Sequence, residues 1–124
     1  MELEHILKDV LQRDARVVFA YLYGSTLDSQ EPRDIDIAVC ISRPEDPFRV
    51  AADLKVEISR ETGLRADFLD IRVINDVDDL LYLRNVLGGR LLVDKDPELR
   101  GAFLESFAMK YRASEGILAE AYGP

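Results

Sequence analysis

The distribution of hydrophobic and polar positions divides the chain into segments with helical spacing and segments with strand-like spacing. Apolar residues recur every three or four positions in 2–14, which predicts a helix with one buried face. Residues 17–23 are mostly β-branched or aromatic, and 34–41 become apolar after two carboxylates, so both are predicted to be strands. The polar segment 28–33 between them contains Pro32 and is expected to be a surface loop.

Capping residues mark the helix boundaries that follow. Asp46 suits a helix N-cap and Pro47 suits the first helical position, which predicts a helix start there. Gly63 suits the C-terminal stop of that helix, after Thr62. The later elements are expected to be a strand at 65–72, a helix that Asn75 or Asp76 caps and that ends at Leu87, a short strand at 90–93 and a helix from Pro97 to about Tyr122.

These elements predict a single domain over residues 1–124. Their order indicates an α+β fold with a small mixed sheet, helices packed mainly on one face and a long C-terminal helix. An apolar stripe along that last helix is formed by Leu99, Phe103, Phe107, Tyr111, Leu118 and Tyr122. The sequence leaves two interpretations open: the stripe covers the sheet, or its C-terminal half faces a partner chain.

Composition and charge narrow the function classes. The 124 residues are 48% hydrophobic and 32% charged, as in an ordinary globular domain, and no apolar run is long enough for a membrane span. The N-terminal residues lack the pattern of a signal peptide, so a cytoplasmic location is expected. A net charge of −8 disfavours direct binding to DNA or RNA, because phosphate contacts need a basic face. With one cysteine, Cys40, and one histidine, His5, a Cys-cluster zinc site and most histidine-dependent catalysis are excluded.

Candidate chemistry lies between the first two predicted strands. Gly24 permits a sharp turn and a close backbone approach to a ligand, and Ser25 offers a hydroxyl and a backbone N–H that suit an anion. Asp34 and Asp36 are two positions apart on a strand, so both side chains project from one face. Such like charges are unfavourable unless a divalent cation lies among them. The alternatives are an ordinary turn with a serine cap and a solvated strand end.

Gly24-Ser25 followed by Asp34-Ile35-Asp36 resembles the signature of the DNA polymerase beta-like nucleotidyltransferases. More closely, the chain is similar to their minimal form, the MNT proteins paired with HEPN proteins in prokaryotic toxin–antitoxin operons. The similarity extends over nearly the whole chain and includes the predicted strand at 66–71 and the segment 88–92. One difference is the segment from Thr26 to Arg33, which is shorter than the family usually has and lacks its Arg-Gly pair.

The resemblance implies transfer of an AMP group from ATP to a hydroxyl of a partner protein. The implied partner is a HEPN-type RNase toxin with a tyrosine acceptor, which would make this chain an antitoxin. Asp34 and Asp36 are implied to bind two Mg²⁺ ions, and Asp67 to bind the ion near the attacking hydroxyl. Gly24 and Ser25 are implied to contact the phosphates.

The third acid has a rival in Asp70. On a strand, Asp70 would point to the opposite face from Asp67, and the resemblance favours Asp67 as the first acid of the pair. Three converging carboxylates need cations, because each would otherwise raise the pKa of the others. Arg33, Arg43 and Arg72 are candidate phosphate contacts, with plain surface charge as the alternative.

Two other functions are open at the level of sequence. The chain could neutralise its partner by docking alone, with the shortened loop having lost nucleotide affinity. It could also be a small-molecule nucleotidyltransferase that dimerisation completes, and its oligomeric state is left open. Binding of ATP with Mg²⁺ separates catalysis from docking, and co-purification with a HEPN protein separates both from the small-molecule enzyme.

Overall fold

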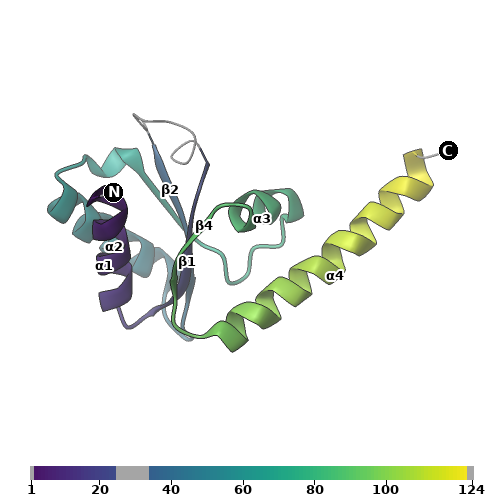
Figure 1. Ribbon diagram of the computed structural model, residues 1–124, viewed down its shortest axis with the longest axis horizontal. Coiled ribbons are helices and arrows are strands. Elements are labelled where there is room, and N and C mark those ends of the chain that lie inside the picture. The colour runs from purple at the N-terminus through teal and green to yellow at the C-terminus, as the bar shows by residue number, and fades with distance from the viewer. Residues whose placement is uncertain (1, 25–33, 123–124) are drawn as a thin grey trace.

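The computed structural model describes residues 2–24 and 34–122, with the side chains of the last helix described up to residue 115. In this part of the chain, a four-stranded sheet lies between two pairs of helices (Figure 1). The helices are α1 (Glu2–Arg13), α2 (Pro47–Thr62), α3 (Leu80–Leu87) and α4 (Pro97–Tyr122). The strands are β1 (Val17–Tyr23), β2 (Ile35–Ile41), β3 (Leu69–Val73) and β4 (Arg90–Asp94), and a 3-10 turn, η2 (Ala66–Phe68), precedes β3.

The strand order is β3–β2–β1–β4, so β3 and β4 are the outer strands. β1 runs antiparallel to both β2 and β4, and Tyr23 lies opposite Asp36. β2 and β3 are parallel, and Asp36 lies opposite Asp70. A parallel pair needs a long crossover connection, which α2 supplies here. The mixed sheet predicted from the sequence is therefore confirmed.

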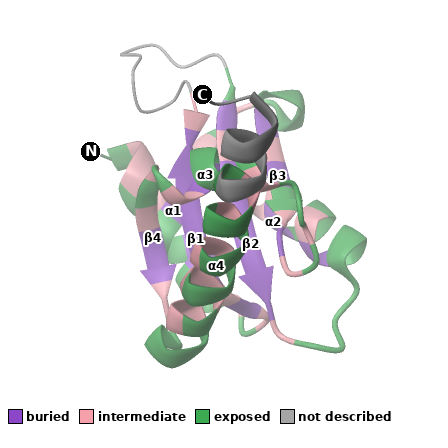
Figure 2. Cartoon of the chain, turned by 90° about the vertical axis from the view of Figure 1, so that its right-hand side faces the viewer, coloured by how far each residue is buried: buried purple, intermediate pink, exposed green. Residues whose placement is uncertain are grey.

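The α+β class and the long C-terminal helix are also confirmed, but the helices are not gathered mainly on one face. α1 and α2 cover one face of the sheet, while α3 and the first part of α4 cover the other (Figures 1 and 2). The reason lies in the two central strands, which are buried along almost their whole length on both faces. Each face therefore needs its own apolar cover.

The predicted boundaries of α2 are confirmed because they depend on local capping. The Asp46 side chain accepts hydrogen bonds from the backbone N–H groups of Phe48 and Arg49, at 3.0 and 3.4 Å. Gly63 ends the helix with φ of 75°, a left-handed conformation that suits glycine.

The predicted start of α3 at Asn75 or Asp76 is wrong. Its N-cap is Asp79, whose side chain accepts a hydrogen bond from the Tyr82 backbone N–H at 3.1 Å. The Asn75 side chain is engaged elsewhere: it accepts from the Ile41 backbone N–H at 2.9 Å and donates to the Ile41 carbonyl at 2.7 Å. This long-range bridge holds the segment after β3 in a non-helical path.

The first part of α4 packs against the core with partly buried side chains, which resolves one half of the open question about its stripe. Phe103 packs on Phe19 with ring centroids 5.5 Å apart. Phe107 stacks on Tyr111 at 5.4 Å, and both rings are partly exposed. Beyond this contact the helix backbone extends away from the sheet (Figure 1). Among the described residues, no helix combines the length and apolar character needed to cross a membrane.

Candidate functional site

The site begins at the end of β1, where the backbone turns next to a carboxylate. Gly24 has φ of 78°, and a Cβ placed on it would collide with Oδ2 of Asp36. Two features of this position require glycine: its left-handed backbone conformation, and the close approach of the Asp36 carboxylate to its Cα. The close backbone approach predicted for Gly24 is present, and its neighbour in the structure is a carboxylate. Ser25, the other predicted phosphate contact, lies outside the described residues, as does the segment to Arg33.

Two carboxylates face each other across β2 and β3. Asp36 and Asp70 occupy opposite positions in the parallel register, and both are partly buried. Residues opposite each other in a sheet project from the same face, so their charges interact. The pKa of Asp36 is raised, first by burial and then by the negative charges of Asp70 and Asp34, while Arg72 opposes the shift. Asp34 is exposed one residue before β2.

The prediction that Asp67 lies on the strand beside Asp36 is wrong. Residues 66–68 form the turn η2, and the strand begins only at Leu69. Asp67 is exposed there and pairs with Arg65 at 2.9 Å. Because the alternation of side chains applies only within a strand, it could not be counted from Asp67. The structure therefore brings Asp70 into register with Asp36.

An aromatic and cationic group borders the acid pair. The Arg72 guanidinium lies 3.5 Å from the Asp70 carboxylate and 5.3 Å from the centre of the Tyr82 ring. The Tyr82 and Tyr23 hydroxyls are hydrogen-bonded at 2.8 Å. Burial is the first cause that raises the pKa of both tyrosines, so both stay neutral at physiological pH.

Sequence reasoning identified Arg72 as a candidate phosphate contact but missed the two tyrosines. Arg72 is two positions after Asp70 on one strand, so a shared face was predictable. Tyr82 is 59 residues from Tyr23 and lies on a helix. No signal in the sequence pairs those two side chains, because the packing of α3 on the sheet brings them together.

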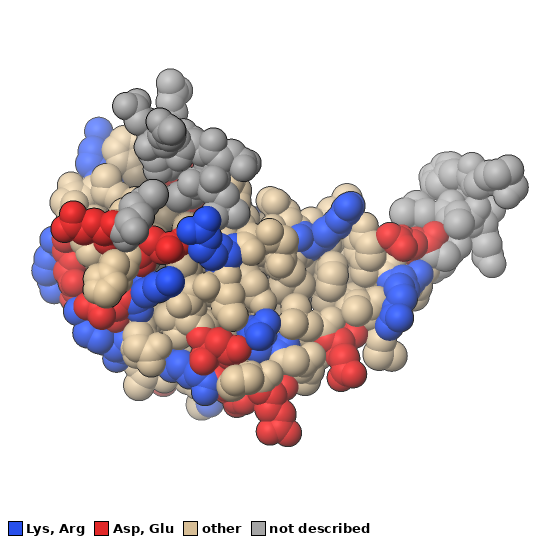
Figure 3. Space-filling view, in the orientation of Figure 1, with Lys and Arg blue, Asp and Glu red and all other residues tan. Residues whose placement is uncertain are grey.

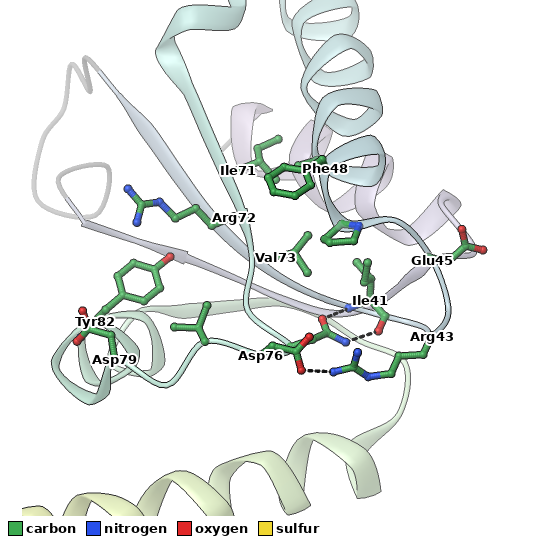
Figure 4. A pocket seen from close by; sticks show the side chains of 14 residues that line it. Ile41, Arg43, Glu45, Phe48, Ile71, Arg72, Val73, Asp76, Asp79 and Tyr82 are labelled. Carbon is green, nitrogen blue, oxygen red and sulfur yellow. Dashed lines mark hydrogen bonds and ion pairs between the residues drawn. The ribbon is translucent and has the colours of Figure 1, made fainter.

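A groove of about 540 Å³ begins at Arg72 and Tyr82 and continues along β3 (Figure 4). Its walls come from the first turns of α2, the outer strand β3 and the segment that leads into α3. At the far end, Arg43 pairs with Asp76 at 2.5 Å. Arg43, another candidate phosphate contact, is thus held away from the acid pair. In Figure 4, the dashed lines mark this ion pair and the bridge to Ile41.

The donor set suits a hard divalent cation. Carboxylate oxygens are the ligands that Mg²⁺ prefers, and Asp34, Asp36 and Asp70 supply them at one end of the sheet. Gly24 leaves the Asp36 carboxylate unobstructed by a side chain. Within the described residues, three acidic, cysteine or histidine side chains do not meet closely enough to form a complete metal cage. The described site is therefore an acid pair with a third acid nearby.

Charges of both signs are mixed on the surface. On the face shown in Figure 3, Lys and Arg side chains are interspersed with Asp and Glu and do not form one basic patch. An extended phosphate backbone needs such a patch, whereas one nucleotide needs only a local site.

A family model described as polymerase beta, nucleotidyltransferase, matches residues 5–98. No curated protein matches the chain. Solved structures match it over nearly the whole length. They include the toxin–antitoxin MntA-HepT, 17% identical over 97% of this chain and 90% of the other, with a TM-score of 0.61. A toxin–antitoxin structure with AMP-PNP is 18% identical over 95% and 90%, with a TM-score of 0.64.

A third structure is a tri-AMPylated Shewanella oneidensis HEPN toxin in complex with MNT antitoxin. Its matched chain is 18% identical over 97% of this chain and 89% of the other, with a TM-score of 0.62. At such identities the likeness establishes a shared fold.

Proposed function

Since this chain belongs to the polymerase beta nucleotidyltransferase family, we propose that it transfers an AMP group from ATP to a hydroxyl of a HEPN-family toxin and thereby acts as an antitoxin. The observation that carries the proposal is the pairing of Asp36 with Asp70 beside the turn at Gly24. The choice of nucleotide and partner is supported by the similar structures, of which one contains AMP-PNP and another an AMPylated HEPN toxin.

In the proposed reaction, an acceptor hydroxyl oxygen forms a bond to the α-phosphorus of ATP. The bond from that phosphorus to pyrophosphate breaks, and pyrophosphate leaves with the electron pair. Asp34, Asp36 and Asp70 are the proposed ligands of two Mg²⁺ ions, which would neutralise the phosphate charge and polarise the acceptor hydroxyl. Asp70 takes the place beside the attacking hydroxyl that the resemblance implied for Asp67, and it also takes the proton of that hydroxyl.

The neighbouring residues have supporting roles in this proposal. Gly24 keeps the space beside Asp36 free of side-chain atoms, so that a phosphate can approach the carboxylate. Arg72 offsets part of the charge of Asp70, and its contact with the Tyr82 ring orients the guanidinium. The hydrogen bond between the Tyr82 and Tyr23 hydroxyls links this group to β1.

The experiment compares two aspartates of one segment, Asp70→Asn and Asp67→Asn. Transfer of label from ATP radiolabelled at the α-phosphate to a co-expressed HEPN protein is measured for both variants and for Asp36→Asn. Asp36→Asn and Asp70→Asn are expected to lower the rate about a hundredfold or more. Asp67→Asn is expected to transfer at the wild-type rate, because Asp67 contacts Arg65 on the surface.

The outcomes separate the parts of the proposal. Loss of transfer in Asp67→Asn with retention in Asp70→Asn would restore Asp67 as the third acid. Wild-type transfer in all three variants would show that the acid pair is not the catalytic site.

A second candidate is an antitoxin that acts by docking alone. It is favoured by the segment from Thr26 to Arg33, which is shorter than usual for the family. Calorimetric titration of the chain with ATP and Mg²⁺ distinguishes the two functions. Catalysis requires binding that Asp36→Asn weakens, whereas docking alone predicts no binding and full neutralisation of the toxin by the Asp36→Asn chain.

A further inference from the structure

The outer edge of β3 carries backbone groups that pair with nothing in the described chain. β3 has β2 on one side only, and the Ile74 N–H donates to the Val39 carbonyl at 2.9 Å. Since successive residues of a strand direct their backbone groups to opposite sides, Arg72 also faces β2, while Ile71 and Val73 direct theirs outward. Among the described residues, none bonds to these outward groups.

These outward groups border the groove described above. Ile71 and Val73 line it along the strand, and Phe48 and Ala51 line it from α2. Phe48 is 86% exposed, so its ring is accessible to a ligand in the groove. Figure 4 shows Phe48 beside Ile71, with Val73 farther along the same groove. The groove thus combines an apolar wall with unpaired hydrogen-bonding groups.

The groove also leads to the acid pair. Its inner end is formed by Arg72 and Tyr82, and Arg72 lies 3.5 Å from the Asp70 carboxylate. In an in-line displacement, the attacking and leaving oxygens lie on opposite sides of the phosphorus. If the phosphates of ATP lie near Gly24 at the end of β1, the acceptor must approach over β3, from the side on which the groove opens.

We propose that the groove binds an extended segment of the acceptor protein, which pairs with Ile71 and Val73 as an additional strand and brings its hydroxyl to Asp70. This inference rests on the proposed function, and it concerns how the chain recognises its acceptor protein. An extended peptide is the occupant because the regular spacing of its backbone groups matches that of successive outward N–H and C=O groups. Its alternate side chains contact Phe48 and the neighbouring apolar wall.

Amide hydrogen exchange tests this pairing without any substitution. Ten-residue synthetic peptides that cover the sequence of the co-expressed HEPN protein are added to the isotope-labelled full chain, and exchange is followed by NMR. One or more peptides are expected to slow exchange at Ile71 and Val73. The Arg72 and Ile74 amides face β2 and are internal controls with little change. If no peptide protects Ile71 and Val73, or if protection is uniform along β3, the proposal is overturned.

A backbone substitution tests the consequence for transfer. Val73→Pro removes one outward N–H, and proline is tolerated in an outer strand where its N–H would face away from the sheet. Val73→Ala keeps that N–H and is the matched control. Val73→Pro is expected to raise the KM for the HEPN protein about fivefold, as the loss of one hydrogen bond predicts, and Val73→Ala is expected to change it little. Equal KM values for the two variants would contradict the proposal.

The readouts separate this inference from the proposed function. ATP affinity is expected to be unchanged in Val73→Pro, because the outward N–H is not part of the acid pair. If the wild-type chain never labels the HEPN protein, the proposed function is refuted. If a folded Val73→Pro chain labels it with an unchanged KM, only the binding of the acceptor segment in the groove is refuted. Where Val73→Pro fails to fold, the exchange measurement on the unmodified chain decides.

Discussion

The two faces of the sheet are built from different residues. The face under α1 and α2 is packed with aliphatic side chains such as Leu11, Leu54 and Ile58, which are almost fully buried. The face under α3 and α4 contains Phe19, three buried or half-buried tyrosines and Cys40, and its outer rings are partly exposed. Purely aliphatic packing needs no polar partner, whereas tyrosine hydroxyls need hydrogen bonds.

Under the proposed function, this difference places the catalytic residues and most of the buried core on separate faces of the sheet. Asp36, Asp70 and Arg72 occur at alternate positions on the aromatic face, next to the hydroxyls of Tyr23 and Tyr82. The aliphatic face contains most of the largest fully buried side chains. A substitution on one face is therefore expected to affect mainly stability, and one on the other mainly activity.

The largest expected effect is on activity, from Asp36→Asn on the aromatic face. Nucleotidyl transfer should fall about a hundredfold or more, while the fold persists in circular dichroism spectra. Saturating Mg²⁺ should stabilise the wild type by about 2.7 kcal/mol at a hundredfold excess over Kd, and the variant much less. A variant that gains as much from Mg²⁺ as the wild type would place the cation site elsewhere.

The same variant has a defined pH dependence in chelator. The pKa of Asp36 is raised in the folded chain, so the folded state binds this proton more tightly than the unfolded state. The resulting stability is present below the unfolded pKa of about 3.9 and is lost as pH rises through the folded pKa. Asp36→Asn removes this loss of stability, because asparagine does not ionise. Thermal melts should therefore show a variant as stable as wild type or more so at neutral pH, with the difference shrinking in acid.

Leu54→Ala on the aliphatic face should have the opposite signature. Leu54 is 1% exposed, and truncation of a buried leucine costs about 2–5 kcal/mol. Chemical denaturation should show this loss of unfolding free energy, while transfer per folded molecule stays at the wild-type level. A parallel loss of activity in fully folded protein would mean that the two faces are coupled.

Gly24→Ala should affect both quantities, because Gly24 joins the backbone of β1 to the acid pair. The left-handed backbone costs a non-glycine residue about 1–2 kcal/mol, and the new Cβ displaces the Asp36 carboxylate. Transfer should fall more than the loss of stability predicts. The matched control is Gly63→Ala, at a similar φ but with open space around its Cβ, which should lower stability alone.

The smallest effect is expected for Tyr82→Phe. It removes one hydroxyl hydrogen bond to Tyr23 and keeps the ring over Arg72. The free energy of unfolding should fall by about 0.5–1.5 kcal/mol, measured in urea, and transfer should change only slightly. Tyr82→Ala, which also removes the ring, should lower the transfer rate further. Equal transfer rates in the two variants would show that the ring does not orient Arg72.

Local signals in the sequence were sufficient for most of the elements. Asp46, Pro47 and Gly63 determine the ends of α2, because caps act within one helical turn. The spacing of Asp34 and Asp36 and the turn at Gly24 likewise depend on adjacent residues. The start of α3 was misplaced because Asn75 is also a good local cap, and a long-range bond to Ile41 decides its role.

The sequence by itself determined the family motif, the helices with local caps and the apolar strands. Only the tertiary structure decided that Asp70, rather than Asp67, lies opposite Asp36, and that Tyr82 reaches Tyr23. The physical reason is that the register of parallel strands and the position of a packed helix are set by contacts between residues far apart in the chain. These contacts cannot be inferred from a pattern of neighbouring residues. Because β3 begins two residues after Asp67, Asp70 is the acid that lies on the strand.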